Sequence, residues 1–220
     1  MKRNQKLKLM PLEKYTGVNK DDPLRLYFNP IFGPFYRRRV ELCLGELSGG
    51  ERILEVGFGS GLSFFNLHDI YREIWGIDLT ANTGEITELF RREGIETHLE
   101  NGSVQSMPYP DGFFEGVLLI SILEHIKPDE QARAFREISR VLKPGGQVVY
   151  GVPVERPLMV FLFKLLGFNI REHHFSTEKD VAHAAKQVFH SGSLRTMRAP
   201  TTWGVAVYEV GCFYKERQNR

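Results

Sequence analysis

The chain has 220 residues and a formal net charge of +2, from 29 lysine and arginine against 27 aspartate and glutamate residues. This length suits one α/β domain with a full core, and the near-neutral charge argues against a nucleic-acid-binding domain. The two cysteines, Cys43 and Cys212, exclude a disulfide framework or a cysteine metal cluster, and no apolar run reaches the roughly 20 residues of a membrane span.

The chain divides into three stretches. Residues 1–20 predict a basic flexible arm, whose positive charge is not followed by the apolar stretch of a secretory signal. Residues 21–48 predict an N-terminal helical lid, and residues 49–220 predict the main α/β domain. The expected localisation is cytoplasmic.

The lid is rich in aromatic residues and is interrupted by prolines. Pro30 and Pro34 prevent a continuous helix, so we predict a short helix, a bent loop and a second helix from about Phe35. Tyr27 and its aromatic neighbours either pack the lid onto the sheet or close over a pocket. In the second interpretation Tyr27 touches a cofactor or an acceptor.

The stretch Ile53–Ser63, ILEVGFGSGLS, is an apolar strand that ends in a glycine-rich loop. Gly57, Gly59 and Gly61 occupy alternate positions, where glycine permits positive φ and a close approach of ligand to backbone. A dinucleotide-binding loop would have its third glycine one residue later, at Leu62. A nicotinamide cofactor is therefore disfavoured, and a helix is expected to open at about Leu62.

With an acid in front, the loop has the pattern acid-x-Gly-x-Gly-x-Gly. In this pattern the chain resembles the class I S-adenosylmethionine-dependent methyltransferases of the type 11 (UbiE-like) small-molecule group, whose first motif is matched by Glu55, Gly57, Gly59 and Gly61. The resemblance implies an α/β, Rossmann-like three-layer sandwich, with a mostly parallel seven-stranded sheet and a C-terminal antiparallel hairpin. It also implies S-adenosyl-L-methionine as the cofactor.

Asp78 closes the next apolar strand, REIWGIDLT. A carboxylate at this place accepts hydrogen bonds from ribose hydroxyls in dinucleotide and adenosylmethionine sites alike. Alternatively, Asp78 caps the helix expected near residues 81–93. Asp78 is then available to the ribose only where a neighbour such as Thr80 caps the helix in its place. Asp78 therefore predicts an adenosine pocket without choosing the cofactor.

A third strand is predicted at about residues 96–100, and Gly102, Ser103 and Val104 follow it where the family has Gly-Asp-Ala. Ser103 thus replaces the acid that receives the adenine amino group in the family. A serine hydroxyl accepts this bond more weakly than a carboxylate. We expect either a backbone contact to the adenine or a reduced affinity.

A fourth strand, residues 116–122, is almost entirely apolar, as a strand buried on both faces must be. Ile120 and Ser121 stand near its carboxyl end, where open α/β sheets bind ligands. The resemblance and these positions together assign the following residues to cofactor binding: Tyr27, Glu55, Gly57, Phe58, Gly59, Gly61, Asp78, Leu79, Ser103, Val104, Ile120 and Ser121.

An amphipathic helix is predicted over residues 128–141. It ends in Leu-Lys-Pro-Gly-Gly, residues 142–146, and feeds a strand at residues 147–152. This helix stop recurs in the methyltransferase family and extends the resemblance over roughly residues 49–153.

The last third of the chain matches the family by element order alone. An apolar helix is predicted at residues 155–168 and another at residues 178–188, within a helical insertion, residues 155–192, near the acceptor side. Strands at residues 193–199 and 206–214 then form the terminal antiparallel hairpin.

His125, just past the fourth strand, is the best-placed candidate for a general base. A histidine in this position also serves as a packed or hydrogen-bonding residue, and that alternative stays open. His173 and His174 either reach the acceptor side from their loop, or bind a metal with His183, or are simply polar surface; we favour polar surface, since no Asp or Cys completes a metal-ligand set. No metal site is expected.

The predicted reaction is methyl transfer to a small or lipid-like acceptor, such as a quinone precursor, by in-line displacement. Its basis is the aromatic lid and the apolar stretch 157–168, which either enclose an amphipathic acceptor at a membrane surface or simply pack on the sheet. The alternatives are a protein that binds S-adenosylmethionine without turnover, and a methyltransferase acting on protein or RNA. No nucleic-acid partner is expected, and the oligomeric state is not readable from the sequence.

Overall fold

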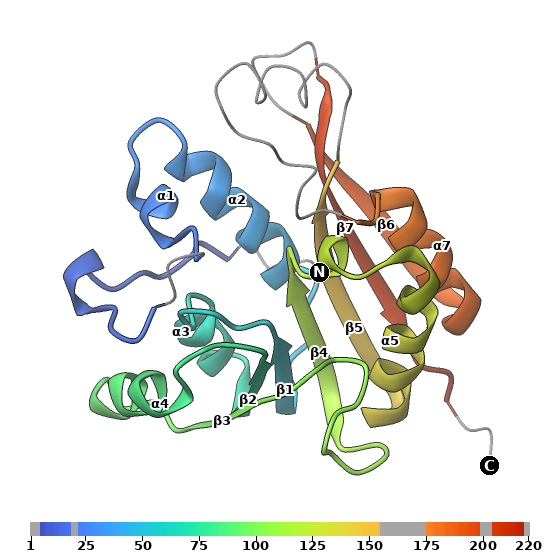
Figure 1. The fold of residues 1–220 in the computed structure, drawn as a ribbon, viewed down its shortest axis with the longest axis horizontal. Helices are drawn as coiled ribbons and strands as arrows, with labels where there is room; N and C mark the ends of the chain where they lie inside the picture. The colour runs from blue at the N-terminus through green and yellow to red at the C-terminus, as the bar shows by residue number, and fades with distance from the viewer. Residues whose placement is uncertain (1–4, 19–21, 155–174, 199–203, 218–220) are drawn as a thin grey trace.

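The computed structural model describes residues 5–18, 22–154, 175–198 and 204–217. Its centre is a seven-stranded sheet in the order β3-β2-β1-β4-β5-β7-β6 (Figure 1). Strands β1 to β5 pair in parallel, and β7 is antiparallel to both β5 and β6. The expected mostly parallel sheet with a C-terminal antiparallel hairpin is therefore confirmed. The strands are β1 (Gly50–Val56), β2 (Tyr71–Asp78), β3 (Thr97–Asn101), β4 (Phe114–Ile120), β5 (Leu142–Pro153), β6 (Ser191–Arg198) and β7 (Ala206–Tyr214).

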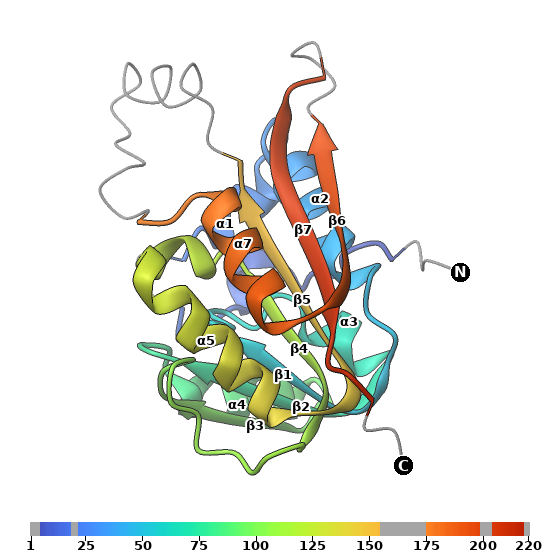
Figure 2. The same cartoon turned by 90° about the vertical axis from the view of Figure 1, so that its right-hand side faces the viewer.

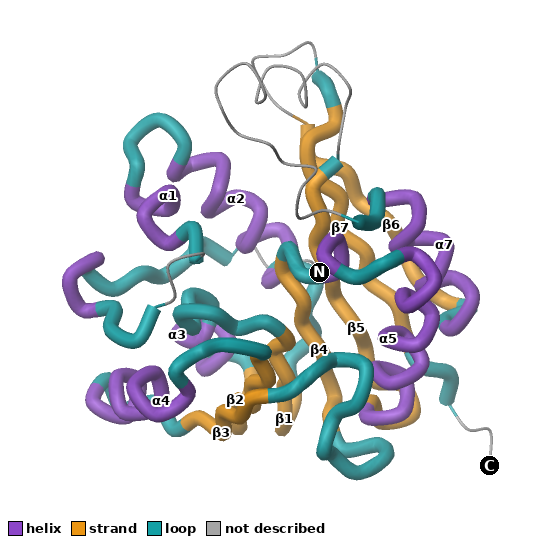
Figure 3. Tube along the Cα trace, in the orientation of Figure 1, coloured by secondary structure: helices purple, strands orange, loops and turns teal. Residues whose placement is uncertain are grey.

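Helices cover both faces of the sheet (Figures 2 and 3). One face packs against α2, α3 and α4, and the other packs against α5 and α7. The helical elements are η1 (Leu12–Lys14), α1 (Leu24–Phe28), α2 (Gly33–Leu44), α3 (Phe64–His68), α4 (Thr83–Arg92), η2 (Leu123–His125), α5 (Pro128–Val141) and α7 (Glu178–Val188).

Successive residues of the central strands bury themselves on opposite faces. Ile53 and Leu118 belong to the core under α2 to α4, whereas their neighbours Leu54 and Leu119 belong to the core under α5 and α7. All four side chains are fully buried. A strand that is covered on both faces must be apolar at every position, which explains the continuous apolar runs of β1 and β4.

Residues 5–18 pack against the domain, in contrast to the flexible arm expected over residues 1–20. Met10 and Tyr15 are buried. The backbone N–H of Lys8 donates to Asn66 Oδ1 at 2.9 Å, which ties this segment to α3. Two apolar anchors and one long-range hydrogen bond therefore hold a segment whose basic composition had suggested a solvated tail.

The lid has the predicted short helix, loop and long helix, but its long helix begins at Gly33 instead of Phe35. Asn29 explains the difference, because its side-chain Oδ1 accepts from the N–H groups of Ile31 and Phe32 at 2.8 and 3.0 Å. This local turn starts the helix early, and Pro34 then occupies a first-turn position where its missing N–H costs nothing.

The ends of β4 and β5 differ from the predicted ones. Strand β4 stops at Ile120 because Ser121 has a φ of 57°, which no extended strand accommodates. The Leu-Lys-Pro-Gly-Gly stretch is the irregular beginning of β5, not only a helix stop: Leu142 pairs with Phe114, and the register then jumps to Gln147 opposite Gly116.

The remaining elements follow the sequence closely. The helices at 128–141 and 178–188 and the strand at 206–214 have the predicted bounds, whereas β3 and β6 are displaced by one or two residues. The predicted helix at 155–168 lies outside the described residues. Helix α7, the described helix of the predicted 155–192 insertion, packs on α5.

Two further expectations concern cysteines and membrane spans. Cys43 and Cys212 are both buried, and neither forms a disulfide. None of the helices in the described ranges combines the length and the apolar composition needed to cross a bilayer.

Arg140, at the end of α5, holds the loop before β4. Its guanidinium donates to the backbone oxygens of Met107 and Tyr109 at 2.9 and 2.7 Å, and to carboxylates of Asp111 and Glu137. Hydrogen bonds from a charged group contribute more to stability than neutral ones. Arg140→Met should therefore lower the free energy of unfolding by about 1–3 kcal/mol, measured by urea denaturation.

Arg136→Met is the matched control, because Arg136 is exposed on the same helix. Its effect should stay within about 0.5 kcal/mol. Equal losses in the two variants would show that the loop contacts of Arg140 are not the cause.

Candidate functional site

The candidate site lies at the carboxyl ends of the central parallel strands. The chain leaves β1 towards β2 on one side, whereas β4 follows on the other side of β1. In open α/β sheets this reversal creates a crevice where ligands bind. In Figure 1 the arrowhead of β4 points towards α2, so the lid stands at the same end of the sheet.

The loop after β1 has the backbone conformation that its glycines predict. Gly57, Gly59 and Gly61 have φ values of 69°, 50° and 69°, all in the left-handed region. A Cβ on Gly57 would overlap the Ile122 side chain, and one on Gly59 would lie 2.7 Å from Asp22 Oδ2. The loop is therefore packed from both sides, by the segment after β4 and by the lid.

Asp78, at the end of β2, fastens the glycine-rich loop to the next crossover. Its Oδ2 accepts from the N–H of Gly59 at 3.1 Å, and its Oδ1 accepts from the N–H groups of Thr80 and Ala81 at 2.9 and 3.0 Å. Asn82, rather than Asp78, caps helix α4. Because a carboxylate has about four lone-pair directions, Asp78 retains acceptor capacity on Oδ2 for a ribose hydroxyl.

Glu55 lies beneath the loop and is buried. Ser63 Oγ donates a hydrogen bond to its carboxylate. Burial raises the pKa of Glu55 to about 8, and the charge of Asp78 raises it further while the Ser63 hydrogen bond opposes the shift. Glu55 therefore supports the loop from below and exchanges a proton near neutral pH.

A third carboxyl group, which the sequence analysis did not single out, reaches the loop from the lid. Asp22 Oδ2 accepts from the N–H of Ser60 at 2.8 Å. Burial raises the pKa of Asp22, Ser60 opposes this shift, and the charge of Asp78 adds to it. Three acidic side chains, Asp22, Glu55 and Asp78, thus converge on one loop, where the pKa of about 8 leaves Glu55 mostly uncharged at neutral pH.

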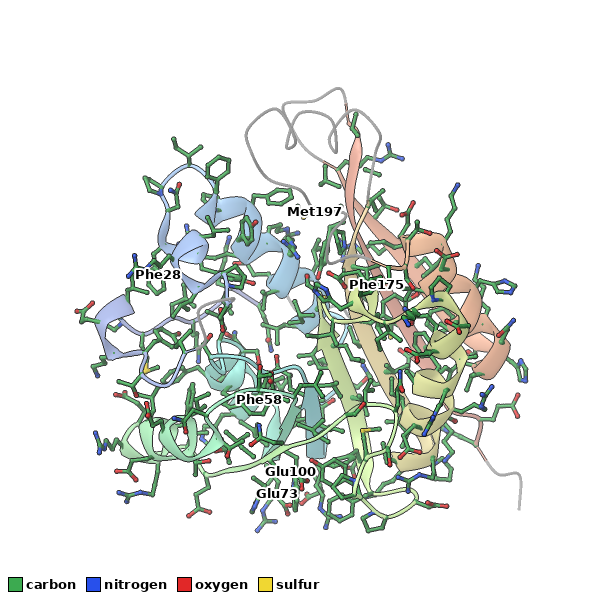
Figure 4. The ribbon with its side chains drawn as sticks, viewed as in Figure 1. Phe28, Phe58, Glu73, Glu100, Phe175 and Met197 are labelled. Carbon is green, nitrogen blue, oxygen red and sulfur yellow. The ribbon has the colours of Figure 1, made fainter. Side chains whose placement is uncertain are left out.

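The candidate residues for the adenine side are spread over the ends of β1 to β3. Phe58, labelled in Figure 4, is buried with its ring against Gly76 of β2, so it contributes its backbone to the loop. Leu79 is 73% exposed next to Asp78. Ser103 Oγ accepts from the N–H of Gln105 at 3.2 Å, and Val104 is buried.

The candidate residues of the fourth strand face the lid. Ile120 is half-buried, and Ser121 follows it with its unusual positive φ. Tyr27 of α1 is buried and its ring meets Tyr36 edge-on, with 5.5 Å between centroids. Burial raises the pKa of Tyr27 to about 12, so its phenol is neutral at physiological pH. Tyr27 packs within the lid, and its predicted contact with the cofactor stays a prediction.

His125 is exposed at the end of η2. The turn that carries it is held from two sides. Gln131 of α5 donates to the carbonyl oxygens of Leu123 and Ile126, and the N–H of Phe175 donates to the Glu124 carbonyl at 2.8 Å. The fold therefore fixes the backbone of His125 beside the end of β4.

The other candidate histidines are not brought to this place within the described part of the chain. His173 and His174 lie outside the described residues. His183 is exposed on α7, where its Nε2 is 3.0 Å from Gln187 Nε2. Among the described residues, no group of three His, Cys, Asp or Glu side chains is arranged to hold a metal ion.

Sequence reasoning missed Asp22, Arg39, Gln131 and Tyr208. Arg39 donates to Ser121 Oγ across 82 residues of sequence, and Tyr208 Oη lies 3.1 Å from the same hydroxyl. Such contacts depend on how the lid and β7 pack at the end of β4. The spacing of these residues in the sequence therefore does not predict that they are in contact.

Comparison with known sequences places this region in a family. Residues 54–150 match the family described as methyltransferase domain. A ubiquinone biosynthesis O-methyltransferase of Alkalilimnicola ehrlichii is 33% identical over 130 residues, which is 58% of this chain and 51% of that protein. A demethylmenaquinone methyltransferase of Tropheryma whipplei is 30% identical over 116 residues, 52% of this chain and 46% of that protein. The chain spans about half the length of these curated relatives.

Solved structures show the same fold. The N-methyltransferase NodS of Bradyrhizobium japonicum, in complex with S-adenosyl-L-homocysteine, has a TM-score of 0.67 at 16% identity and covers 92% of this chain and 96% of its own. The cyclase SpnF has a TM-score of 0.67 at 19% identity, and the match covers 84% of this chain and 83% of SpnF. Residues 54–150 thus resemble a methyltransferase domain in sequence, and the chain has the fold of these solved structures.

The raised pKa of Glu55 makes folding stability depend on pH. The protonated carboxyl is favoured in the folded protein, so the stabilisation it gives is fully present below the ordinary pKa of 4.5 and is lost as pH rises through about 8. Glu55→Gln keeps an acceptor for Ser63 but cannot ionise. Relative to wild type, this variant should gain a few kcal/mol between about pH 6 and about pH 9, in urea denaturation without cofactor.

Glu51→Gln is the control, since Glu51 is exposed on the same strand. Its unfolding free energy should follow wild type at every pH. The same pH dependence in Glu55→Gln and wild type would contradict the assignment of this titration to Glu55.

Proposed function

We propose that the protein transfers a methyl group from S-adenosylmethionine to a small or lipid-like acceptor by in-line displacement. The observation that carries the proposal is the glycine-rich loop at the switch point of the sheet, surrounded by Asp22, Glu55 and Asp78. When bound, S-adenosylmethionine supplies an electrophilic methyl group on a positively charged sulfur. Its sulfonium and ammonium groups match the negative charge of this loop.

In this proposal the loop and Asp78 contact different parts of the cofactor. The backbone of Gly57, Gly59 and Gly61, held in the left-handed region, approaches the methionine part, and Asp78 accepts a hydrogen bond from the ribose. Leu79, already exposed, offers an apolar surface to the adenine. We assign the other predicted residues to the surroundings of this crevice: Tyr27, Glu55, Phe58, Ser103, Val104, Ile120 and Ser121.

The chain's own contribution to the reaction is mainly positioning. Displacement at a sulfonium needs an aligned nucleophile and exclusion of water, and neither requires a metal or a covalent intermediate. A hydroxyl acceptor gains from a base that removes its proton. We assign this role to His125, because the turn after β4 holds its backbone near the strand end.

The acceptor class is proposed from the relatives and from the lid. Two relatives are named as methyltransferases of ubiquinone and menaquinone biosynthesis, whereas a human relative, 28% identical over 122 residues, is named as a tRNA N(3)-cytidine methyltransferase. Ile31 and Phe32, at the connection between α1 and α2, are 77% and 55% exposed. Exposed apolar side chains on the lid favour an amphipathic acceptor and peripheral contact with a membrane.

Titration calorimetry tests the cofactor and a transfer screen tests the reaction. S-adenosylmethionine and S-adenosylhomocysteine should both bind, and Asp78→Ala should weaken both at least tenfold, because the ribose contact and the anchor of the loop are lost. A methyl-transfer screen over quinone precursors, other phenols and tRNA should then find a small-molecule acceptor.

The alternatives give different results in the same experiments. Binding without any transfer would indicate a protein that only binds the cofactor, and transfer to tRNA would replace the small-molecule proposal. The absence of binding to either ligand would overturn the proposed function.

The raised pKa of Glu55 predicts a pH-dependent discrimination between donor and product. Protonation of Glu55 removes negative charge, which matters more for the cationic S-adenosylmethionine than for S-adenosylhomocysteine. The affinity ratio of donor over product should therefore rise several-fold from about pH 6 to about pH 8.5. In Glu55→Gln the rise should be smaller. An unchanged ratio across this range would contradict an electrostatic role of Glu55.

A further inference from the structure

Arg39 of the lid is placed differently from the other arginines of α2. Arg37 donates to the backbone oxygen of Tyr27, and Arg38 is exposed and pairs with Glu41. Arg39 turns inward instead, and its guanidinium carbon lies 4.4 Å from the ring centroid of Tyr208 and 5.1 Å from that of Tyr36. The cation is thus held in an aromatic setting at the end of the sheet.

The hydrogen bonding of Arg39 is incomplete. One terminal nitrogen donates to Ser121 Oγ, but Nε is buried and has no hydrogen-bond partner among the described residues. A buried donor on a charged group costs free energy unless a partner satisfies it. Arg39 Nε can therefore donate a hydrogen bond to a further acceptor.

The charge of Arg39 is also only partly compensated. Burial raises the pKa values of Tyr27 and Tyr208, which keeps these phenols neutral. The charge of Arg39 is therefore faced mostly by neutral aromatic rings.

Arg39 stands next to the proposed cofactor crevice. Its partner Ser121 follows β4 with a φ of 57°, a conformation that is strained for a non-glycine residue and persists where the surroundings impose it. The next residue, Ile122, is the side chain that a Cβ on Gly57 would overlap. The cation is thus joined to the glycine-rich loop through two consecutive residues.

We propose that Arg39 binds an anionic group, a carboxylate or a phenolate, on an aromatic methyl acceptor, with Tyr36 and Tyr208 framing the guanidinium. A guanidinium offers planar, bidentate hydrogen bonds that suit a carboxylate, and the surrounding rings suit an aromatic body. This inference rests on the proposed function, because it specifies the acceptor of the same reaction. It goes further by assigning a specificity-determining residue to the lid.

The experiment uses matched pairs of aromatic probes that differ in charge. Benzoate, 4-hydroxybenzoate and 1-naphthoate are each titrated against the corresponding amide, by calorimetry, with and without saturating S-adenosylhomocysteine. Wild type should bind at least one carboxylate tenfold or more tightly than its amide. Arg39→Gln should bring this ratio close to one, and Arg39→Lys should retain part of it, since lysine keeps the charge but not the planar fork.

Arg38→Gln is the control, because it removes one exposed guanidinium from the same helix. It should keep the wild-type ratio, and thermal melts should show that every variant is folded. An amide bound as well as its carboxylate by wild type, or an equal loss in Arg38→Gln and Arg39→Gln, would overturn the proposal. Failure of S-adenosylhomocysteine to bind would instead contradict the proposed function, while the titrations without it still report on Arg39.

Discussion

The hydrogen bonds accepted by Asp78 hold the candidate site together. One carboxylate joins the N–H of Gly59 to those of Thr80 and Ala81, so the glycine-rich loop and the entry to α4 are fixed by the end of a single strand. The backbone of the loop is strained for any residue but glycine, and it needs such an external anchor. The position of the loop in turn determines where Ile122 and Ser121 lie, because Gly57 packs directly against Ile122.

The lid completes the site from outside the region that matches the methyltransferase family. Asp22 accepts from Ser60 in the loop, and Arg39 donates to Ser121 after β4, so two lid residues contact the two halves of the crevice. Arg39 belongs to α2, whose residues Val40 and Cys43 are buried, whereas Asp22 precedes α1. The strands and the glycine-rich loop form the proposed cofactor crevice, and the lid adds charged side chains to it.

The sequence was sufficient for the sheet and for the loop because both depend on local patterns. Apolar runs predicted the buried strands, and the spacing of Gly57, Gly59 and Gly61 predicted the positive φ values that these residues have. The end of β4 was predicted two residues late, since the turn at Ser121 is imposed by Arg39 and Tyr208, which are distant in sequence. Asp22 was missed for the same reason: its contact with Ser60 spans 38 residues and follows no periodicity.

The charges around the crevice suggest how binding and reactivity are divided. Carboxyl groups surround the proposed donor end and a guanidinium stands at the proposed acceptor end, so each side of the site favours the opposite charge on its ligand. The positive charge of the donor disappears as the methyl group leaves the sulfonium, whereas a carboxylate held by Arg39 stays charged on the acceptor. Groups that favour those charges stabilise the bound reactants at least as much as the transition state, and therefore contribute to affinity more than to rate. It follows that Asp22 and Arg39 select and retain the reactants, whereas the rate depends on the alignment that the rigid loop and the strained Ser121 impose.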